Sequence, residues 1–168
     1  RDYTVRHVTL SRCQSCHGAS SGVMTVSGDP RKLHVDAQQA PNVGHFVLPY
    51  LYRWDYVEES LLKESVAQLE RIIAYEGRGN IAAILLEGES GISGCLKYPV
   101  GYLQEIRKIC NNHGILIIMD EVMSGFGRTG KWFGFENHGM FPDMIAMAKG
   151  FTCGYLPLGC LMVTDKIA

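Results

Sequence analysis

Two apolar runs in the second half of the chain each lead directly into ionisable residues. Residues 115–119 (ILIIM) are followed by Asp120 and Glu121, and residues 144–148 (MIAMA) are followed by Lys149. Short, near-continuous runs rich in β-branched residues or methionine are typical of strands buried on both faces of a parallel sheet. We therefore expect a carboxylate and an amine at the carboxyl ends of two strands, where open α/β sheets bind their ligands.

An acid and an amine in such positions could act on one ligand. Pyridoxal phosphate suits them, because its aldehyde forms a Schiff base with lysine and its ring nitrogen needs an acidic partner. In this interpretation Asp120 keeps the ring nitrogen protonated, so that the ring accepts electrons, and Lys149 moves a proton as the base. The pattern alone also allows a simpler alternative, in which Asp120 caps a turn and Lys149 is solvated.

The sequence around both residues resembles the class III, fold-type I aminotransferases. The resemblance rests on residues 120–130 (DEVMSGFGRTG), 148–150 (AKG) and 154–159 (GYLPLG). It covers most of residues 81–168, and a weaker similarity extends back to residue 11. The resemblance implies that the protein uses pyridoxal 5'-phosphate.

The same resemblance implies roles for individual residues. Lys149 and Asp120 are then catalytic and bind the cofactor, and Val122 packs on the face of its ring. Glu87, which ends another apolar run, lines the substrate pocket, and Gly88 stands where the family usually has proline. From the residues alone, a hydrogen-bonded turn acid remains the alternative for Glu87.

Residues 13–18 (CQSCHG) allow two interpretations. The C-x-x-C-H pattern is the attachment pattern of c-type haem, so Cys13, Cys16 and His17 could hold haem or a metal. In the family that the chain resembles, this stretch reads aromatic-x-Ser-aromatic-His-Gly, and the second aromatic stacks on the cofactor. His17 and Gly18 match that pattern, and Cys16 replaces the stacking ring. The resemblance therefore places Cys16, His17 and Gly18 beside the cofactor.

Residues 125–130 (GFGRTG) satisfy the G-x-G-x-x-G pattern of dinucleotide-binding sites. That fingerprint requires the glycines to open a helix, with an acid about twenty residues further on. The residues that follow, 131–135 (KWFGF), are aromatic and interrupted by glycine. We therefore do not expect a dinucleotide site.

The pattern of elements predicts an α/β fold, with a mostly parallel sheet and helices on both faces. Glycine and proline separate apolar runs of strand length from runs with helical spacing. One helix begins with a predicted capping box at Asp55 and Glu58, and another has Pro99 in its first turn and ends at Gly114. Residues 32–56 show no period and are expected to form a long loop. We expect strands at 5–12, 81–86, 115–119, 144–148 and 160–164. We expect helices at 19–27, from the capping box at 55–58 until Gly77 and Gly79, and at 99–113.

Composition narrows the class of protein. The chain has 168 residues and a formal net charge of −1, which is ordinary for one globular domain and argues against electrostatic binding to nucleic acid or a membrane surface. No apolar run approaches the roughly 18 residues of a membrane span. Six cysteines are too few for a disulfide scaffold. We therefore expect a cytoplasmic protein with reduced thiols.

The sequence thus predicts a transaminase that moves an amino group from an ω-amino donor, of the taurine, β-alanine or 4-aminobutyrate class, to a keto acid such as pyruvate. Racemase or decarboxylase chemistry on the same fold remains the alternative, because Asp120 and Lys149 would serve those reactions too. The resemblance identifies residues 1–168 as part of the cofactor-binding large domain of a homodimer, with the phosphate-loop segment upstream and the small C-terminal domain not present. We therefore expect the chain alone to bind the cofactor weakly.

Overall fold

The computed structural model describes residues 6–38, 40–50, 52 and 57–168. Within them, six strands form one sheet in the order β2-β1-β3-β4-β5-β6. All neighbouring strands are parallel except β5 and β6, which are antiparallel. This confirms the predicted mostly parallel α/β sheet. The strands are β1 (Val8–Arg12), β2 (Val43–Phe46), β3 (Ile81–Glu87), β4 (Leu116–Asp120), β5 (Met144–Met147) and β6 (Cys160–Val163).

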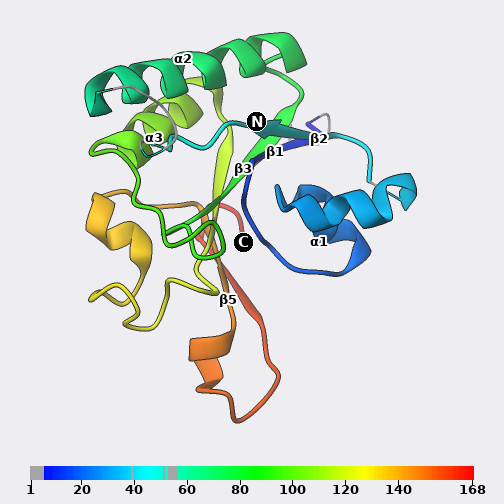
Figure 1. Ribbon diagram of the computed structural model, residues 1–168, viewed down its shortest axis with the longest axis vertical. Coiled ribbons are helices and arrows are strands. Elements are labelled where there is room, and N and C mark those ends of the chain that lie inside the picture. Colours follow the sequence, from blue (N-terminus) through cyan, green and yellow to red (C-terminus); the bar gives the residue numbers. More distant parts are fainter. Residues whose placement is uncertain (1–5, 39, 51, 53–56) are drawn as a thin grey trace.

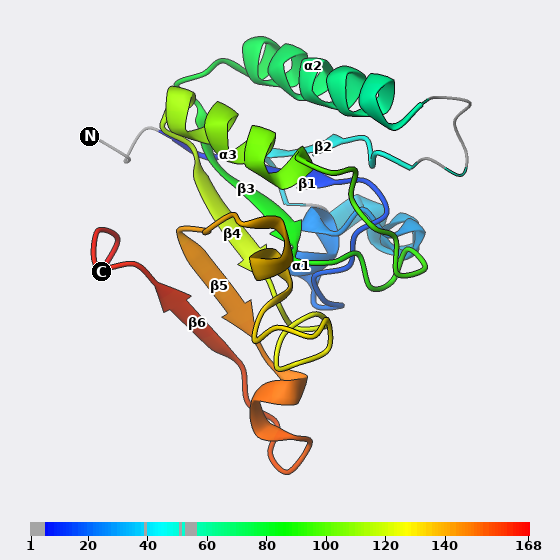
Figure 2. The ribbon, with the colours of Figure 1, turned by 90° about the vertical axis from the view of Figure 1, so that its left-hand side faces the viewer.

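Helices lie on both faces of this sheet. Helices α2 (Glu58–Glu76) and α3 (Tyr102–His113) cover one face, and α1 (Ser21–Val26) lies on the other (Figure 1). Figure 2 shows α2 and α3 side by side above the strands, with α1 behind them. Three short 3-10 helices complete the described structure: η2 (Pro30–Gln38), η4 (Gly134–His138) and η5 (Lys149–Thr152). No helix in the described ranges is both long and apolar enough to cross a membrane.

The hydrophobic core lies between the sheet and the α2–α3 layer. Each helix places side chains at helical spacing against alternate residues of the strands, as expected for one apolar face. Helix α3 ends at Gly114, whose φ of 64° is left-handed and suits a glycine C-cap, as predicted. The core includes Leu69 and Ile73 of α2, Leu103 and Ile106 of α3, Ile84 and Leu86 of β3, and Ile117 and Met119 of β4.

The prediction that β4 and β5 are buried on both faces is wrong. In β4 the buried residues Ile117 and Met119 alternate with half-buried Leu116 and Ile118, and in β5 only Met147 is buried. Helix α1 has six residues and packs near β1 and β2, so no described helix covers the same face of β4 and β5. An apolar run identifies a strand, but its burial depends on what the rest of the fold places over it.

Three details of the predicted elements also need correction. Residues 32–56 are not one long loop, because η2 and β2 lie within them. Strand β2 (VGHF) has four residues and contains glycine and histidine, so it has no strand pattern in the sequence. Pro99 precedes α3, which begins at Tyr102 after the N-cap Gly101. Helix α2 starts after Val57, and the Asp55 half of the predicted capping box lies outside the described residues.

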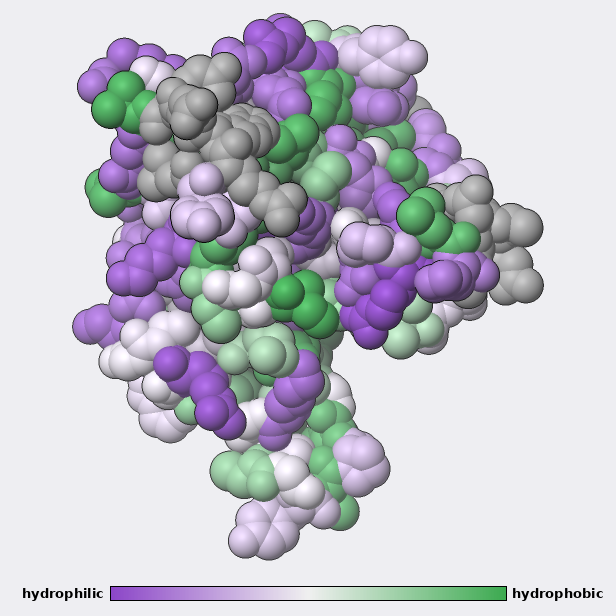
Figure 3. Space-filling view, in the orientation of Figure 1, coloured by the Kyte–Doolittle hydropathy of each residue, from purple (hydrophilic) through white to green (hydrophobic). Residues whose placement is uncertain are grey.

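Strands β5 and β6 and the segment between them project from the body as an arm (Figure 2). Lys149 lies at the base of this segment, as the first residue of η5. Hydrophobic side chains of the arm reach solvent, and green hydrophobic atoms show on its surface in Figure 3. They include Phe151, Leu156, Leu158, Leu161 and Met162.

The position of Ile84 in the core lets us predict how truncation of its side chain changes the free energy of unfolding. Ile84 is fully buried in the middle of the sheet, so Ile84→Ala removes apolar contacts and leaves a cavity, at a cost of about 2–5 kcal/mol in the free energy of unfolding. Urea denaturation followed by circular dichroism measures it. The control is Ile92→Ala, because Ile92 is 54% exposed and its truncation should change the free energy by only about 0.5 kcal/mol or less. Equal effects of the two variants would contradict the assigned core.

Candidate functional site

Parallel pairing brings the predicted site residues to one edge of the sheet. Glu87 at the end of β3 pairs in register with Asp120 at the end of β4, and Asp120 pairs with Ala146 of β5. Lys149 follows Ala146 by three residues along the chain. The carboxylates and the amine therefore lie at the carboxyl edge of the sheet, as the sequence predicts.

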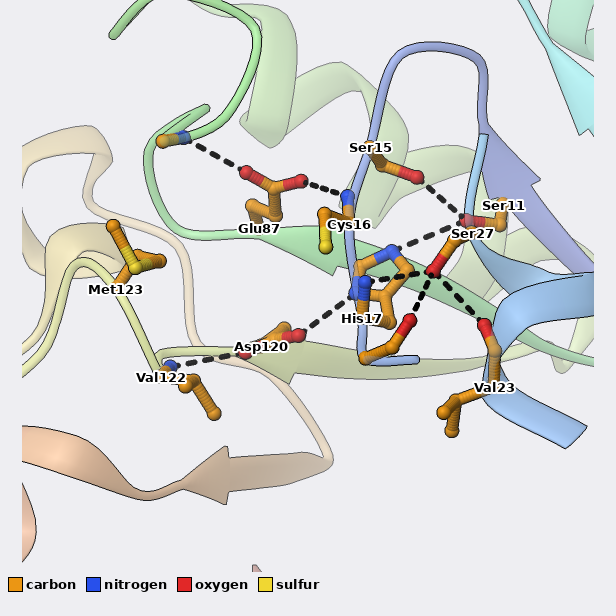
Figure 4. Close-up of polar contacts among 12 residues, drawn as sticks. Ser11, Ser15, Cys16, His17, Val23, Ser27, Glu87, Asp120, Val122 and Met123 are labelled. Carbon is orange, nitrogen blue, oxygen red and sulfur yellow. Dashed lines mark hydrogen bonds and ion pairs between the residues drawn. The ribbon is translucent and has the colours of Figure 1, made fainter. Parts of the chain in front are cut away.

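Asp120 is buried and firmly held. One carboxylate oxygen, Oδ2, lies 2.8 Å from Nδ1 of His17, and the other, Oδ1, accepts the backbone N–H of Val122 at 3.0 Å. A carboxylate only accepts hydrogen bonds, so the proton of the first bond is on His17 Nδ1. The sequence marked His17 only as a match to a family pattern, and its contact with Asp120, 103 residues away, is new. Figure 4 shows the imidazole between Asp120 and Ser11.

The loop after β1 fixes the position of His17. Its Nε2 lies 3.2 Å from Ser11 Oγ, and its backbone N–H donates to Ser27 Oγ at 2.9 Å. Both ring nitrogens are therefore used within the protein. The ring presents Nδ1 to Asp120 and stabilises the negative charge there.

The structure does not support haem or a metal at Cys13, Cys16 and His17. A ring whose two nitrogens are already bonded has none left for iron, and Cys16 Sγ accepts a hydrogen bond from the Arg31 guanidinium at 3.3 Å. In the part of the chain that the structure describes, no group of three or more His, Cys, Asp or Glu side chains is arranged to hold a metal ion.

Lys149 lies in a left-handed backbone conformation, with φ of 48°. Such a conformation is costly for a residue with a side chain and is often found at functional sites. The side chain is exposed, and its Nζ lies 2.8 Å from Met123 Sδ. Lys149 also lines a cavity of about 960 Å³ at the carboxyl edge of the sheet. Other residues that line the cavity are Ser90, Gly91, Tyr98, Val122, Met123 and Arg128.

Glu87 is absent from the described lining of this cavity. Its carboxylate is buried, and it accepts the backbone N–H of Cys16 at 3.0 Å and that of Gly91 at 2.9 Å (Figure 4). The structure thus shows Glu87 as a hydrogen-bonded acid, and its role in the substrate pocket stays a prediction.

Glu121 is a third carboxylate at this edge, and the sequence gave it no role. It is fully buried and accepts the hydroxyl of Ser124 at 2.6 Å and the backbone N–H groups of Gly134 and Phe135 at 2.8 and 3.0 Å. Burial raises the pKa of Glu121, and these bonds partly oppose that rise. Glu121 thereby closes the loop of residues 121–135. A Cβ at Gly88 would lie 2.1 Å from Glu121 Oε1, which gives a reason for glycine there.

The glycines of residues 125–130 belong to this loop and do not open a helix. Residues 122–129 form turns, and the next regular element is the 3-10 helix η4. The expectation that these glycines do not open a helix is therefore confirmed.

Comparison with known proteins identifies the family. The model of the family "Aminotransferase class-III" matches residues 1–168. The taurine–pyruvate aminotransferase of Bilophila wadsworthia is 35% identical over 159 residues, which cover 94% of this chain and 35% of that protein. The putrescine–pyruvate aminotransferase of Pseudomonas aeruginosa is 35% identical over 165 residues, which cover 96% of this chain and 36% of that protein. The chain thus spans about a third of the length of these curated relatives.

Solved structures share the fold. The taurine:2-oxoglutarate aminotransferase of Bifidobacterium kashiwanohense, solved with PLP and glutamate, superposes with a TM-score of 0.94 at 39% identity, covering 98% of this chain and 38% of that one. An (S)-enantioselective omega-transaminase from Thermomicrobium roseum superposes with a TM-score of 0.91 at 37% identity, covering 96% of this chain and 36% of that one.

Glu121 predicts how stability changes with pH. Because burial raises its pKa above the ordinary value of 4.5, the folded chain keeps this proton at pH values where the unfolded chain has released it. The contribution of Glu121 to the free energy of unfolding therefore falls as the pH rises from 4.5 through the raised pKa. The glutamine of Glu121→Gln cannot titrate. We therefore expect the free energy of unfolding, measured by urea denaturation over this pH range, to fall less steeply with pH in the variant than in the unaltered chain.

The same substitution also has an effect that does not depend on pH. In the variant, the glutamine NH₂ group replaces a carboxylate oxygen that accepts hydrogen bonds. The donors that faced this oxygen lose their acceptor, which lowers the free energy of unfolding by about 1–3 kcal/mol. The control is Glu136→Gln, an exposed carboxylate of η4 that accepts one backbone N–H, from Phe133. Parallel pH profiles for the unaltered chain and Glu121→Gln would count against a buried, titrating Glu121.

Proposed function

We propose the function on the premise that this chain belongs to the class-III aminotransferase family. It moves an amino group from an ω-amino donor of the taurine, β-alanine or 4-aminobutyrate class to a keto acid such as pyruvate. One observation carries the proposal: a buried carboxylate, Asp120, held by His17 at the end of β4, beside the strand that leads to Lys149. The names of the relatives, taurine–pyruvate and putrescine–pyruvate aminotransferase, support the choice of donor and acceptor.

The residues of this edge fit pyridoxal phosphate. Each oxygen of Asp120 accepts one hydrogen bond, and a carboxylate oxygen has two lone pairs, so Asp120 can accept another bond from a protonated ring nitrogen. The amine of Lys149 lines a cavity together with Val122 and Met123, whose side chains offer apolar contact to a ring. When bound, the cofactor supplies an electrophilic aldehyde and an electron-accepting ring.

The chain's own residues then have distinct tasks. Asp120 holds a negative charge opposite a ring nitrogen, and His17 Nδ1 keeps that carboxylate oriented. Lys149 Nζ takes a proton from the carbon that carries the amino group of the donor. The same amine then delivers this proton to a second carbon nearby. Nζ contacts Met123 Sδ, which is a weak hydrogen-bond acceptor, so this contact holds the amine in place less firmly than a carboxylate would.

Cys16 offers a smaller contact than the aromatic ring of the family pattern. It lies beside Glu87 and Arg31, next to His17, and its half-buried thiol leaves less area for stacking (Figure 4). We propose that Cys16, His17 and Gly18 still border the cofactor. In this arrangement His17 acts mainly through its hydrogen bond to Asp120.

We further propose that the chain forms part of the cofactor-binding large domain of a cytoplasmic homodimer. The hydrophobic side chains exposed on the arm are the kind of surface that a subunit contact covers. The six cysteines are all free, which suits a reducing compartment.

Trapping of the cofactor tests the proposal. Incubation of the chain with excess pyridoxal phosphate, followed by borohydride and peptide mass analysis, should give a phosphopyridoxyl adduct on Lys149, because reduction captures even a weakly bound cofactor. Lys149→Ala should lose this adduct, and the control Lys131→Ala, which changes another exposed lysine, should keep it. An adduct spread evenly over surface lysines would contradict the assignment.

The products distinguish the reactions of this fold. Transamination from β-alanine to pyruvate forms alanine at the rate at which the donor is consumed. Release of carbon dioxide without alanine, or inversion of an amino acid without a keto product, would identify a decarboxylase or a racemase in its place.

A further inference from the structure

Arg12, the last residue of β1, is a fully buried cation that the mechanism above does not use. Its guanidinium donates from Nη1 to Tyr98 Oη at 2.9 Å and from Nη2 to Ser90 Oγ at 3.0 Å, and it lies 5.1 Å from the centre of the Tyr98 ring. Nη2 is also 3.6 Å from Glu87 Oε1, and both side chains of this pair are at most 5% exposed.

Three of the groups held by Arg12 and Glu87 belong to the wall of the cavity. Ser90 and Tyr98 accept hydrogen bonds from Arg12, and Gly91 donates its N–H to Glu87 Oε2; all three residues line the cavity. The hydroxyl of Tyr98 also donates to the backbone oxygen of Glu87 at 2.9 Å. The buried pair therefore fixes the segment 90–98 from behind.

From Glu87, contacts lead to both predicted catalytic residues. On one side Gly91 abuts Met123, since a Cβ at Gly91 would lie 3.1 Å from Met123 Cβ, and Met123 Sδ contacts Lys149 Nζ.

On the other side Glu87 Oε1 accepts the N–H of Cys16, and the next residue, His17, bonds to Asp120. Glu87 thus lies where the supports of the amine and of the acid meet.

Stability alone is a weak reason for such a pair. Removing two charges from water costs several kcal/mol, and replacing a buried ion pair by apolar residues is often neutral or stabilising. Arg12 also has an Nε atom that is buried and without a hydrogen-bond partner. A cation kept under these conditions is better explained by the groups that it orients.

We propose that Arg12 is a positioning residue of the active site. It holds the Glu87 carboxylate in the one orientation that serves Gly91 and Cys16 together, and so sets the spacing between Lys149 and Asp120. The inference rests on the proposed function, but its main tests need no cofactor.

The experiment compares two arginines of the same chain, of which Arg12 is fully buried and Arg107 is half-buried. Arg12→Met removes the guanidinium and keeps much of its volume. Arg107→Met is the matched control: Arg107 also pairs with a carboxylate, Asp143, at 2.6 Å and also has a buried Nε without a partner, but it lies on α3 and has no contact with the site among the described residues.

Two measurements report on the site in the cofactor-free chain. Proton–nitrogen NMR follows the His17 Nδ1–H resonance, which marks the bond to Asp120. The pH profile of chemical labelling at Lys149, read by peptide mass against Lys131, follows the environment of the amine. Arg12→Met should lose or shift the His17 resonance and displace the Lys149 profile, whereas Arg107→Met should lower the thermal midpoint and leave both readouts unchanged.

Additional variants keep the test decisive if Arg12→Met does not fold. Ser90→Ala combined with Tyr98→Phe removes both hydrogen bonds from the Arg12 guanidinium to the cavity wall and keeps the charges of Arg12 and Glu87. This double variant should displace the pH profile of labelling at Lys149. Arg12→Lys, which keeps the charge, should partly restore the His17 resonance. Loss of thermal stability with both site readouts unchanged would show a merely structural Arg12 and overturn the proposal. A displaced profile in a chain that forms no Lys149 adduct would uphold the positioning and reject the proposed function.

Discussion

The carboxyl edge of this sheet depends on one constraint, which is that a buried carboxylate must have its oxygens hydrogen-bonded. Glu87 and Asp120 end two neighbouring strands, Glu121 follows Asp120, and each of the three is at most 8% exposed. Leaving any of them without donors would cost more than most single contacts in the fold contribute. Each therefore recruits donors from other segments, and those segments become the loops of the site.

The three acids divide the loops among themselves. Asp120 takes the imidazole of His17 and thereby fixes the loop after β1, while Glu121 gathers the two ends of residues 121–135. Glu87 binds backbone N–H groups from both the loop after β1 and the cavity wall, with Arg12 as the nearby cation. A group of acids that would repel one another in isolation acts here as a set of anchors, because the donors of each come from a different part of the chain.

The sequence predicted the parts of the fold that depend on local pattern. Apolar runs placed β3, β4, β5 and β6 to within about two residues, and Gly114 marked the end of α3. It could not predict what tertiary packing decides. Strand β2 has too few residues to show a pattern, and one face of β4 is only half-buried because the short α1 packs near β1 and β2. For the site, strand ends identified Asp120 and Lys149, but the contact of His17 with Asp120 joins residues 103 positions apart and has no local signal. Glu121 was adjacent to a predicted site residue and was missed because its bonds run to Gly134 and Phe135.

The two predicted catalytic residues differ in how the structure holds them, and the difference follows their tasks. Asp120 has to present a fixed charge, and it is buried, bonded at both oxygens and placed at the end of a central strand. Lys149 has to bring one amine to successive positions, and it starts the exposed η5, where the one side-chain partner of Nζ in the described structure is the sulfur of Met123. A strong ion pair at Lys149 would hold the amine in one place, and so would oppose its movement between successive positions. A weakly held lysine beside a rigid acid is therefore the arrangement that this chemistry needs, and the buried carboxylates provide the rigid half of it.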